Sequence, residues 1–230
     1  MSSEPENLAE LLSNFRRILK MTDSKSLFEY DSKIRLNNKI ICGVDEAGRG
    51  PLAGDVYASA VIFNEDVFID GINDSKKISE KKRERLFDEI IQKSFSYCIA
   101  TASVSEIDSI NILQASMLAM KRAVEGLSVV PDLVLVDGNK IPSGMPCKCE
   151  CIVKGDAKSA SIASASVLAK VARDRYMKEL AEKYPDYMFE KHKGYPTKLH
   201  YEMLEKYGVS DIHRKSFLKK FYARHNEQKS

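Results

Sequence analysis

Two adjacent acidic residues followed by a glycine-rich loop are the clearest chemical feature of this sequence. Asp45 and Glu46 close an apolar, β-branched run that begins at Ile40, and glycine and proline residues follow over 48–54. The run predicts a buried strand, and the residues after it predict a tight loop. Because ligands usually bind at the carboxyl ends of strands in open α/β sheets, the two carboxylates indicate a site. A strand that simply ends in a solvated turn would have the same composition, and the pair alone does not decide between the two.

The glycines of this loop have two interpretations. Successive strand residues face opposite sides of a sheet, so Asp45 and Glu46 reach one ligand only if the chain bends after them. We expect residues 47–50 to provide the bend, because glycine accepts positive φ angles. The glycines at 48, 50 and 54 also approach a dinucleotide-binding fingerprint, but the last gap is one residue too long. Residues 55–63 predict a strand where that fingerprint needs a helix, so this second interpretation is set aside.

Two further acids lie at the ends of predicted elements. Asp137 ends the short apolar run 132–137, which predicts a central strand buried on both faces. A charge there is costly unless it is paired or bound to a metal, which favours a functional role over a turn. Asp156 precedes a long helix predicted to reach Lys183, where a carboxylate could cap the helix or bind a metal. Both roles use the same oxygens, and the sequence leaves both open.

Together the four acids predict a site for hard divalent cations. Carboxylate oxygens suit Mg²⁺ or Mn²⁺ rather than zinc. Gathered at one place, they would repel one another and keep raised pKa values until cations bind. Two such ions about 3.5–4 Å apart could activate water and stabilise the attacking and leaving oxygens of a phosphodiester. The residues expected to do this are Asp45, Glu46, Asp137 and Asp156.

The predicted elements alternate as an α/β fold requires. Five strands are expected, over residues 39–46, 55–63, 95–104, 132–137 and 148–154. Helices are expected from Glu80 with Ser79 as its cap, from Asn111 to Pro131, over 155–183 and around 201–207. The stretch 185–194 is expected to be a loop, and the apolar clusters at 8–12 and 15–21 to be N-terminal helices outside the core.

Composition places the chain among ordinary globular proteins. Of its 230 residues, 43% are hydrophobic and 30% are charged, and this length allows one well-buried domain with an added helical part. No run is long and apolar enough for a membrane span, and the N-terminus lacks the basic-then-apolar order of a secretory signal. We therefore expect a cytoplasmic protein.

Cysteines and basic residues are unevenly distributed. Cys147, Cys149 and Cys151 alternate as in a half-buried row on a strand, and the paired spacing of a structural zinc site is missing. Without a secretion signal these thiols should be reduced. Six basic residues against two acidic ones over 211–230 suggest contact with phosphates, although a solvated helix face would look the same.

Over about residues 39–217 the sequence resembles the ribonuclease HII family. The motifs that carry the resemblance occur in order along the chain, at 43–54, 74–77, 111–114, 136–138, 155–159, 164–174, 192–195 and 212–217. The resemblance implies a ribonuclease H-like mixed five-stranded sheet flanked by helices, with a helical C-terminal extension. It divides the chain into an N-terminal helical extension (1–38), a catalytic core (39–184) and a basic, helical, substrate-binding region (185–230).

The resemblance also implies an activity. The family hydrolyses the RNA strand of RNA–DNA hybrids and cleaves 5′ to single ribonucleotides in duplex DNA, leaving 5′-phosphate and 3′-hydroxyl ends. We therefore expect a two-metal reaction with Mg²⁺ or Mn²⁺, by a monomer without membrane partners, in ribonucleotide excision repair and RNA primer removal. The residues that match the family's metal-binding catalytic acids are Asp45, Glu46, Asp137 and Asp156.

The residues that contact substrate in the family also have counterparts. Gly48, Arg49 and Gly50 match the motif that reads the ribose 2′-hydroxyl, the group that distinguishes RNA from DNA at a given position. Tyr195 matches the aromatic residue that stacks on the following deoxyribose. From the sequence alone, Tyr195 could equally be a buried ring that anchors a loop.

Other features are weaker or depart from the family pattern. By the same resemblance, Lys76 and Asn111 are expected to contact phosphates. Pro196 stands where many relatives have glycine, and residues 209–211 replace a proline-bearing turn, so both departures concern the C-terminal loop rather than the catalytic acids. The related ribonuclease HIII family has a different loop and glutamate as its fourth acid, whereas this chain has Asp156.

The sequence leaves two alternative functions open. One is a nuclease of the same fold that cuts DNA, which would not need the Gly48–Gly50 loop together with Tyr195. The other is a protein that binds hybrids without cleaving them. The presence of all four acids argues against the second alternative.

Overall fold

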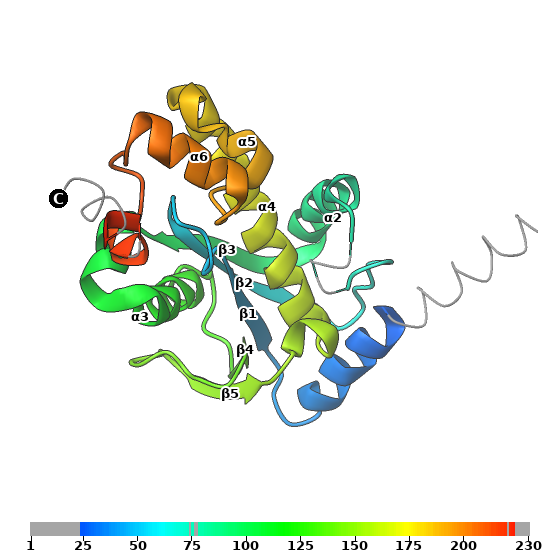
Figure 1. Cartoon of the computed structure of the whole chain (residues 1–230). Coiled ribbons are helices and arrows are strands. Elements are labelled where there is room, and N and C mark those ends of the chain that lie inside the picture. Colours follow the sequence, from blue (N-terminus) through cyan, green and yellow to red (C-terminus); the bar gives the residue numbers. More distant parts are fainter. Residues whose placement is uncertain (1–23, 74, 76–77, 220, 224–230) are drawn as a thin grey trace, which may run out of the picture.

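A mixed five-stranded sheet forms the centre of the molecule (Figure 1). The computed structural model describes residues 24–223, apart from 74, 76, 77 and 220, so the clusters at 8–12 and 15–21 lie outside it. The strand order is β3-β2-β1-β4-β5, with antiparallel pairs β1–β2 and β2–β3 and parallel pairs β1–β4 and β4–β5. The strands are β1 (Ile41–Ala47), β2 (Val56–Phe63), β3 (Ser94–Ala102), β4 (Leu133–Asp137) and β5 (Lys148–Ile152). The predicted fold class, a mixed sheet flanked by helices, is confirmed.

The faces of the sheet are covered by different helices (Figure 1). Cys42 and Val44 pack with α3 (Val104–Glu125), whereas Ile41 packs with Ile162 of α4 (Ala160–Lys183). Gly43 lies under α4, and a Cβ there would overlap the backbone of this helix. Absence of a side chain at Gly43 therefore lets α4 lie directly on β1. The remaining large helix, α2 (Glu80–Lys93), begins as predicted, with the Ser79 side chain accepting a hydrogen bond from the Lys82 amide.

The helix expected from Asn111 begins seven residues earlier. Ser103 and Glu106 form a reciprocal capping box at the start of α3, and Asn111 (φ 67°, ψ 162°) lies at a kink within it. The Asn111 side-chain oxygen accepts hydrogen bonds from the Leu113 and Gln114 amides, so it caps the second half of the helix. Asn111, which the sequence predicts as the first residue of the helix, is therefore the site of the kink within it. The helix also ends at Glu125, before Gly126, rather than at Pro131.

The long helix α4 also begins later than predicted. Its first residue is Ala160, and the Ser159 side chain caps it by accepting a hydrogen bond from the Ile162 amide. Residues Gly155–Ala157 form a separate 3₁₀ turn, η2. Ser159, and not Asp156, is therefore the cap of α4. Of the two roles that the sequence left open for Asp156, only metal binding stays a prediction.

The region after Lys183 is more ordered than expected. The predicted loop 185–194 contains η3 (Pro185–Tyr187) and α5 (Phe189–His192), because aromatic residues there join a buried cluster. The predicted short helix is present as α6 (Lys198–Tyr207), and η4 (Lys215–Phe217) follows it. Leu52 and Ala53, from the loop after β1, belong to the same buried cluster. The C-terminal region thus packs on the loop that follows the two acids.

The described part of the N-terminal segment, which follows the two apolar clusters, packs on the core. Residues 24–35 are helical, and Leu27 is buried against the sheet and α4. Asp31 accepts hydrogen bonds from the Ser161 amide (2.8 Å) and hydroxyl (2.7 Å), which links this helix to the first turn of α4.

The cysteines expected in a half-buried row lie at β5. Cys147, Cys149 and Cys151 are partly buried free thiols. Burial, together with the neighbouring thiols, raises the pKa of Cys149 to about 11. None of the helices in the described part of the chain has the length and apolar character needed to cross a membrane.

Candidate functional site

Asp45 and Asp137 lie side by side at the carboxyl edge of the sheet. β1 and β4 run parallel, and the last residues paired in their register are Val44 and Val136. Each acid is the next residue of its strand, so both project from the same edge and the same face. This one parallel pairing brings together two residues that are 92 positions apart in the chain. The two apolar strands therefore place Asp45 and Asp137 at one edge of the sheet.

Asp45 is the most deeply buried of the four acids. It is 4% exposed, and its Oδ1 accepts a hydrogen bond from the Glu46 amide at 2.7 Å. Burial raises the pKa of Asp45 well above its usual range, and the charges of Glu46 and Asp137 raise it further. A hydrogen bond from Ser166 of α4 lowers this pKa in part. Asp45 therefore lies where negative charge accumulates, as the sequence predicts.

Glu46 reaches this place without the expected bend. β1 stays paired with β2 through Glu46 and Ala47, so residues 47–50 do not bend the two acids together. The Glu46 carboxylate instead forms an ion pair with Arg49 (Oε1 to Nη1, 3.3 Å). Its charge still acts on Asp45 from the neighbouring position. The expected bend is therefore wrong, although the proximity of the two charges is real.

Asp156 is carried to the same edge by η2. The Gly155 amide donates a hydrogen bond to Asp137 Oδ1 at 2.6 Å, so the residue before Asp156 touches the acid of β4. Asp156 itself is 7% exposed. A side chain on Gly155 would crowd Ile162 and Asp137. Glycine at this position lets η2 approach the end of β4.

The four carboxylates fit hard divalent cations by their chemistry. In the described part of the chain, no group of three or more His, Cys, Asp or Glu side chains is arranged closely enough to hold a metal ion. Asp45, Asp137 and Glu46 each have a local partner, respectively the Glu46 amide, the Gly155 amide and Arg49. All four ligands are carboxylates, the type that Mg²⁺ and Mn²⁺ prefer. A cation would also relieve the repulsion that raises the pKa of Asp45.

The loop 48–54 lies next to Tyr195. A Cβ built on Gly50 would lie 3.7 Å from Tyr195 Cε1, and the Leu52 amide donates a hydrogen bond to the Gly194 carbonyl at 2.7 Å. Tyr195 is 38% exposed, with Lys170 Nζ 5.7 Å from its ring centre. Tyr195 is therefore a surface ring beside the loop rather than a buried anchor. Gly48, Arg49 and Gly50 follow Asp45 and Glu46 with one residue between.

The two expected phosphate contacts, Lys76 and Asn111, both stay predictions. Lys76 lies outside the described residues. Its neighbour Ser75 is buried, and its hydroxyl lies 2.9 Å from that of Ser166, the residue that hydrogen bonds to Asp45. Asn111 is exposed at the kink of α3, and its contact with phosphate stays a prediction.

Sequence reasoning missed a buried histidine cluster beneath Tyr195. His192 and His200 stack with ring centres 4.3 Å apart, and His200 Nε2 lies 3.1 Å from His213 Nε2. The Ser210 amide donates to His213 Nδ1, so the His213 proton is on Nε2 and is donated to His200. His200 then donates from Nδ1 to the Tyr195 carbonyl at 3.0 Å. The only sequence signal was the clustering of histidines in the last forty residues.

Because these histidines are buried, we expect the protein to lose folding stability in acid. Burial and neighbouring imidazoles lower the pKa of His200 and of His213 to about 4, from an ordinary 6.5. The stability that their neutral forms provide is complete above pH 6.5 and is lost as the pH falls towards 4. Each group can lower the free energy of unfolding by at most about 1.4 kcal/mol per pH unit in this range. Urea unfolding between pH 7.5 and 4.5 measures the loss.

The variant His213→Asn supplies the control for this prediction. Asparagine keeps an acceptor for the Ser210 amide but does not titrate. Its stability should therefore fall less steeply with acid than that of the wild type. An equal slope for both proteins would contradict the assignment of the acid loss to the histidines.

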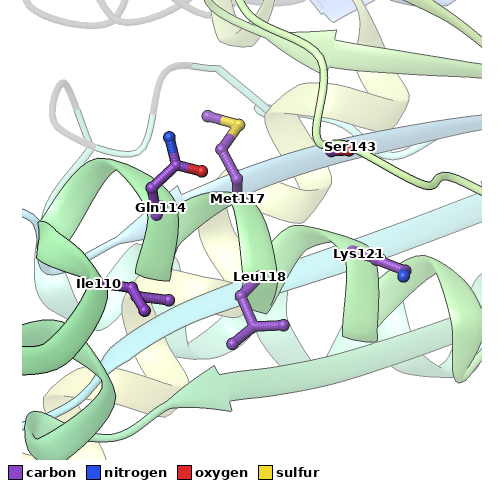
Figure 2. Close-up of a pocket in the computed structure, with 6 residues that line it drawn as sticks. All are labelled: Ile110, Gln114, Met117, Leu118, Lys121 and Ser143. Atoms are coloured by element: carbon purple, nitrogen blue, oxygen red, sulfur yellow. The ribbon is translucent and has the colours of Figure 1, made fainter.

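A separate pocket of about 330 Å³ lies over α3. Figure 2 shows that its lining comes from one side of that helix and from the connection between β4 and β5. Its lining residues are Ile110, Gln114, Met117, Leu118, Lys121 and Ser143. None of the four acids is among them. The carboxylate edge and this pocket are therefore distinct features.

A family model and individual relatives of this chain both carry the name Ribonuclease HII. Residues 42–220 match the family model described as Ribonuclease HII. A Ribonuclease HII of Caldicellulosiruptor bescii is 54% identical over 203 residues, covering 87% of this chain and 98% of the relative. Another, of Acinetobacter baylyi, is 59% identical over 178 residues, covering 77% of this chain and 94% of the relative.

Solved structures agree on the fold. The crystal structure of the ribonuclease H2 from Pyrococcus horikoshii has a TM-score of 0.64 and 28% identity, over 77% of this chain and 93% of that one. A Bst-RNase HIII, solved in complex with Mn²⁺, has a TM-score of 0.58 over 74% of this chain and 63% of that one. At 14% identity, this second likeness shows the fold alone. The family match and these relatives show that this chain belongs to the ribonuclease HII family and is a ribonuclease H enzyme.

Proposed function

We propose that this enzyme hydrolyses the RNA strand of RNA–DNA hybrids and cleaves on the 5′ side of single ribonucleotides embedded in duplex DNA. The products would carry 5′-phosphate and 3′-hydroxyl ends. Acting as a monomer, the enzyme would serve ribonucleotide excision repair and RNA primer removal. The observation that carries the proposal is that the two acids at the end of β1 are followed directly along the chain by the loop 48–54, which lies beside Tyr195.

The carboxylates are proposed to hold the metal ions. Asp45, Glu46, Asp137 and Asp156 would bind one or two Mg²⁺ or Mn²⁺ ions, which when bound polarise the phosphate, activate water and stabilise the leaving oxygen. The raised pKa of Asp45 supports this role, because an unfavourable concentration of negative charge is typical of sites built for cations. Glu46 would be released from Arg49 when it binds a metal, which frees the Arg49 guanidinium for a phosphate.

The loop 48–54 is proposed to recognise the ribose. Gly48 lies three positions after Asp45, a span of about 10 Å in an extended chain, so a sugar bound at the loop would lie close to a phosphate at the acids. Gly50 is exposed and has no side chain, and a Cβ there would lie only 3.7 Å from the Tyr195 ring, so a sugar could lie against the adjoining surfaces of the loop and the ring. Basic residues of the region 185–230 would extend the contact along the phosphate backbone.

One assay tests the proposal. Three duplexes of the same sequence are compared with Mg²⁺ and with Mn²⁺: one with a single ribonucleotide, one with a continuous RNA strand and one of DNA only. We expect cleavage of the first two, with the cut of the first on the 5′ side of the ribonucleotide and a 3′-hydroxyl end. Comparable cleavage of the DNA duplex would overturn recognition of the ribose. Weaker cleavage of the single-ribonucleotide duplex than of the hybrid would weaken the repair role.

A further inference from the structure

Two arginines are fully buried beneath the loop 48–54. Arg214 is 0% exposed and Arg173 is 1% exposed, although arginine is almost never buried completely unless it is paired. Arg214 forms five hydrogen bonds, which equals the number of its N–H donors, and all five end on carbonyl oxygens of the loop. The acceptors, at 2.7–3.2 Å, are Gly48, Arg49, Pro51 and, twice, Gly54.

Arg173 extends this support to the end of the loop and to the segment before Tyr195. It donates from Nη2 to the Ala53 carbonyl (3.0 Å) and from Nε to the Asp55 carbonyl (3.1 Å). From Nη1 it donates to the Lys193 carbonyl at 3.1 Å. One side chain therefore fixes the loop and the segment that leads to Tyr195 relative to each other.

The position of Arg214 is itself fixed from both sides. Asp108 of α3 accepts hydrogen bonds from the Lys215 amide, the Ser216 amide and the Ser216 hydroxyl, at 2.6–3.0 Å. Figure 1 shows this segment, in red, beside α3. The Arg214 amide donates to the Leu52 carbonyl at 2.8 Å, next to a β-bridge between Ala53 and His213. The guanidinium therefore has little freedom to move.

This support determines which way the peptide groups of the loop point. A trans peptide is planar, and its N–H and C=O point in opposite directions. Because the carbonyls of Gly48 and Arg49 face Arg214, the amides of Arg49 and Gly50 face away from it. Both residues are exposed. Two successive amides that point away from a buried cation on the exposed side of a loop can donate hydrogen bonds to a hydroxyl or a phosphate oxygen.

We propose that Arg214, assisted by Arg173, is a positioning residue that sets ribonucleotide selectivity by holding the amides of Arg49 and Gly50 towards the substrate. This inference rests on the function proposed above. The loop then has its binding shape before the substrate arrives, so no binding energy is spent on ordering it. Burial and the charge of Arg173 lower the pKa of Arg214 to about 9, and the guanidinium is still charged at neutral pH.

The variant Arg214→Lys tests the inference. Lysine keeps the charge, but its donors lie on a single nitrogen that cannot reach four carbonyls. Binding to the single-ribonucleotide and DNA-only duplexes is measured with Ca²⁺ in place of Mg²⁺, and cleavage is measured with Mg²⁺. We expect the ratio of the two affinities to fall on the order of 10-fold to 100-fold and KM to rise, while kcat at saturation changes little. The matched control is Arg175→Lys, a surface arginine of α4 paired with Glu84, which should keep the wild-type ratio.

The outcomes separate the possible roles. If Arg214→Lys lowers Tm but keeps the wild-type affinity ratio, Arg214 only stabilises the fold and the inference is overturned. If the wild type itself does not prefer the ribonucleotide duplex, the proposed function fails instead.

If Arg214→Lys does not fold, hydrogen exchange of the wild-type enzyme still tests whether the loop is ordered before substrate binds. The Leu52 and Gly54 amides are hydrogen bonded across the loop, to the carbonyls of Gly194 and Ile212. Hydrogen exchange of the free enzyme should therefore show both amides protected without substrate. Exchange as fast as in an unstructured chain until substrate binds would show that the loop is not preset, and would overturn the inference.

Discussion

Replacing Asp45 with asparagine is expected to reduce cleavage on the order of 10³-fold while leaving duplex binding in place. Asparagine has the shape of aspartate but lacks the charge that a divalent cation requires from its ligands. Binding should be kept because the loop 48–54 and Tyr195 are unchanged, and because one negative charge near the phosphates is removed. Single-turnover cleavage and a binding titration on the single-ribonucleotide duplex measure the two quantities.

The same variant is expected to be more stable than the wild type at neutral pH. The pKa of Asp45 is higher in the folded protein than in the unfolded chain, so ionisation of this group costs stability as the pH rises above 3.8. Asparagine does not ionise and avoids this cost. A gain of about 1 kcal/mol would raise Tm by about 2–4 °C, and the gain should shrink as the pH is lowered. Loss of activity together with a gain in stability is typical of a residue retained for function.

Asp88→Asn is the matched control, since Asp88 is exposed on α2. It should change neither cleavage nor stability appreciably. Wild-type cleavage by Asp45→Asn would contradict the assignment of Asp45 to the site. A fall in stability at neutral pH would instead show that Asp45 is needed to hold the sheet edge together.

The acidic edge could be predicted from sequence because local patterns determine it. Apolar runs that end in Asp45 and Asp137 predict buried strands, and parallel pairing of such strands brings their ends together. The role of Asp156 was ambiguous because a cap and a metal ligand look alike at the start of a helix. The Ser159 cap, three residues later, was present in the sequence but is recognisable only once the helix start is known.

The hydrogen bonds from Arg214 that hold the loop 48–54 could not be predicted from local sequence patterns. Arg214 acts on carbonyl groups about 160 residues away, and a carbonyl acceptor has no side-chain identity that a sequence pattern could reveal. The early start of α3 was predictable, since Ser103 and Glu106 have the spacing of a capping box. The bend expected after Glu46 was wrong because strand pairing with β2 continues through the two acids and outweighs the flexibility of the glycines that follow.

The two glycines of the Gly48-Arg49-Gly50 motif are expected to respond differently to alanine. Gly48 has a φ of +99°, and a Cβ there would overlap the Arg173 side chain. Arg173 is buried and holds three backbone carbonyls, so it cannot move aside without releasing them. Gly48→Ala should therefore cost about 3 kcal/mol of folding stability and displace the loop. Cleavage at a single ribonucleotide should fall on the order of 10²-fold as a result.

Gly50→Ala is the matched comparison in the same motif. Its Cβ would meet only Tyr195, at an ordinary 3.7 Å, so stability should change by less than about 1 kcal/mol. Urea unfolding and cleavage of the single-ribonucleotide duplex are measured for both variants. Loss of cleavage with stability kept in Gly50→Ala would mean that the methyl group obstructs the substrate, which places the sugar against this glycine. If Gly48→Ala instead matches the wild type in stability and in cleavage, then neither the positive φ of Gly48 nor its contact with Arg173 is needed for the loop to work.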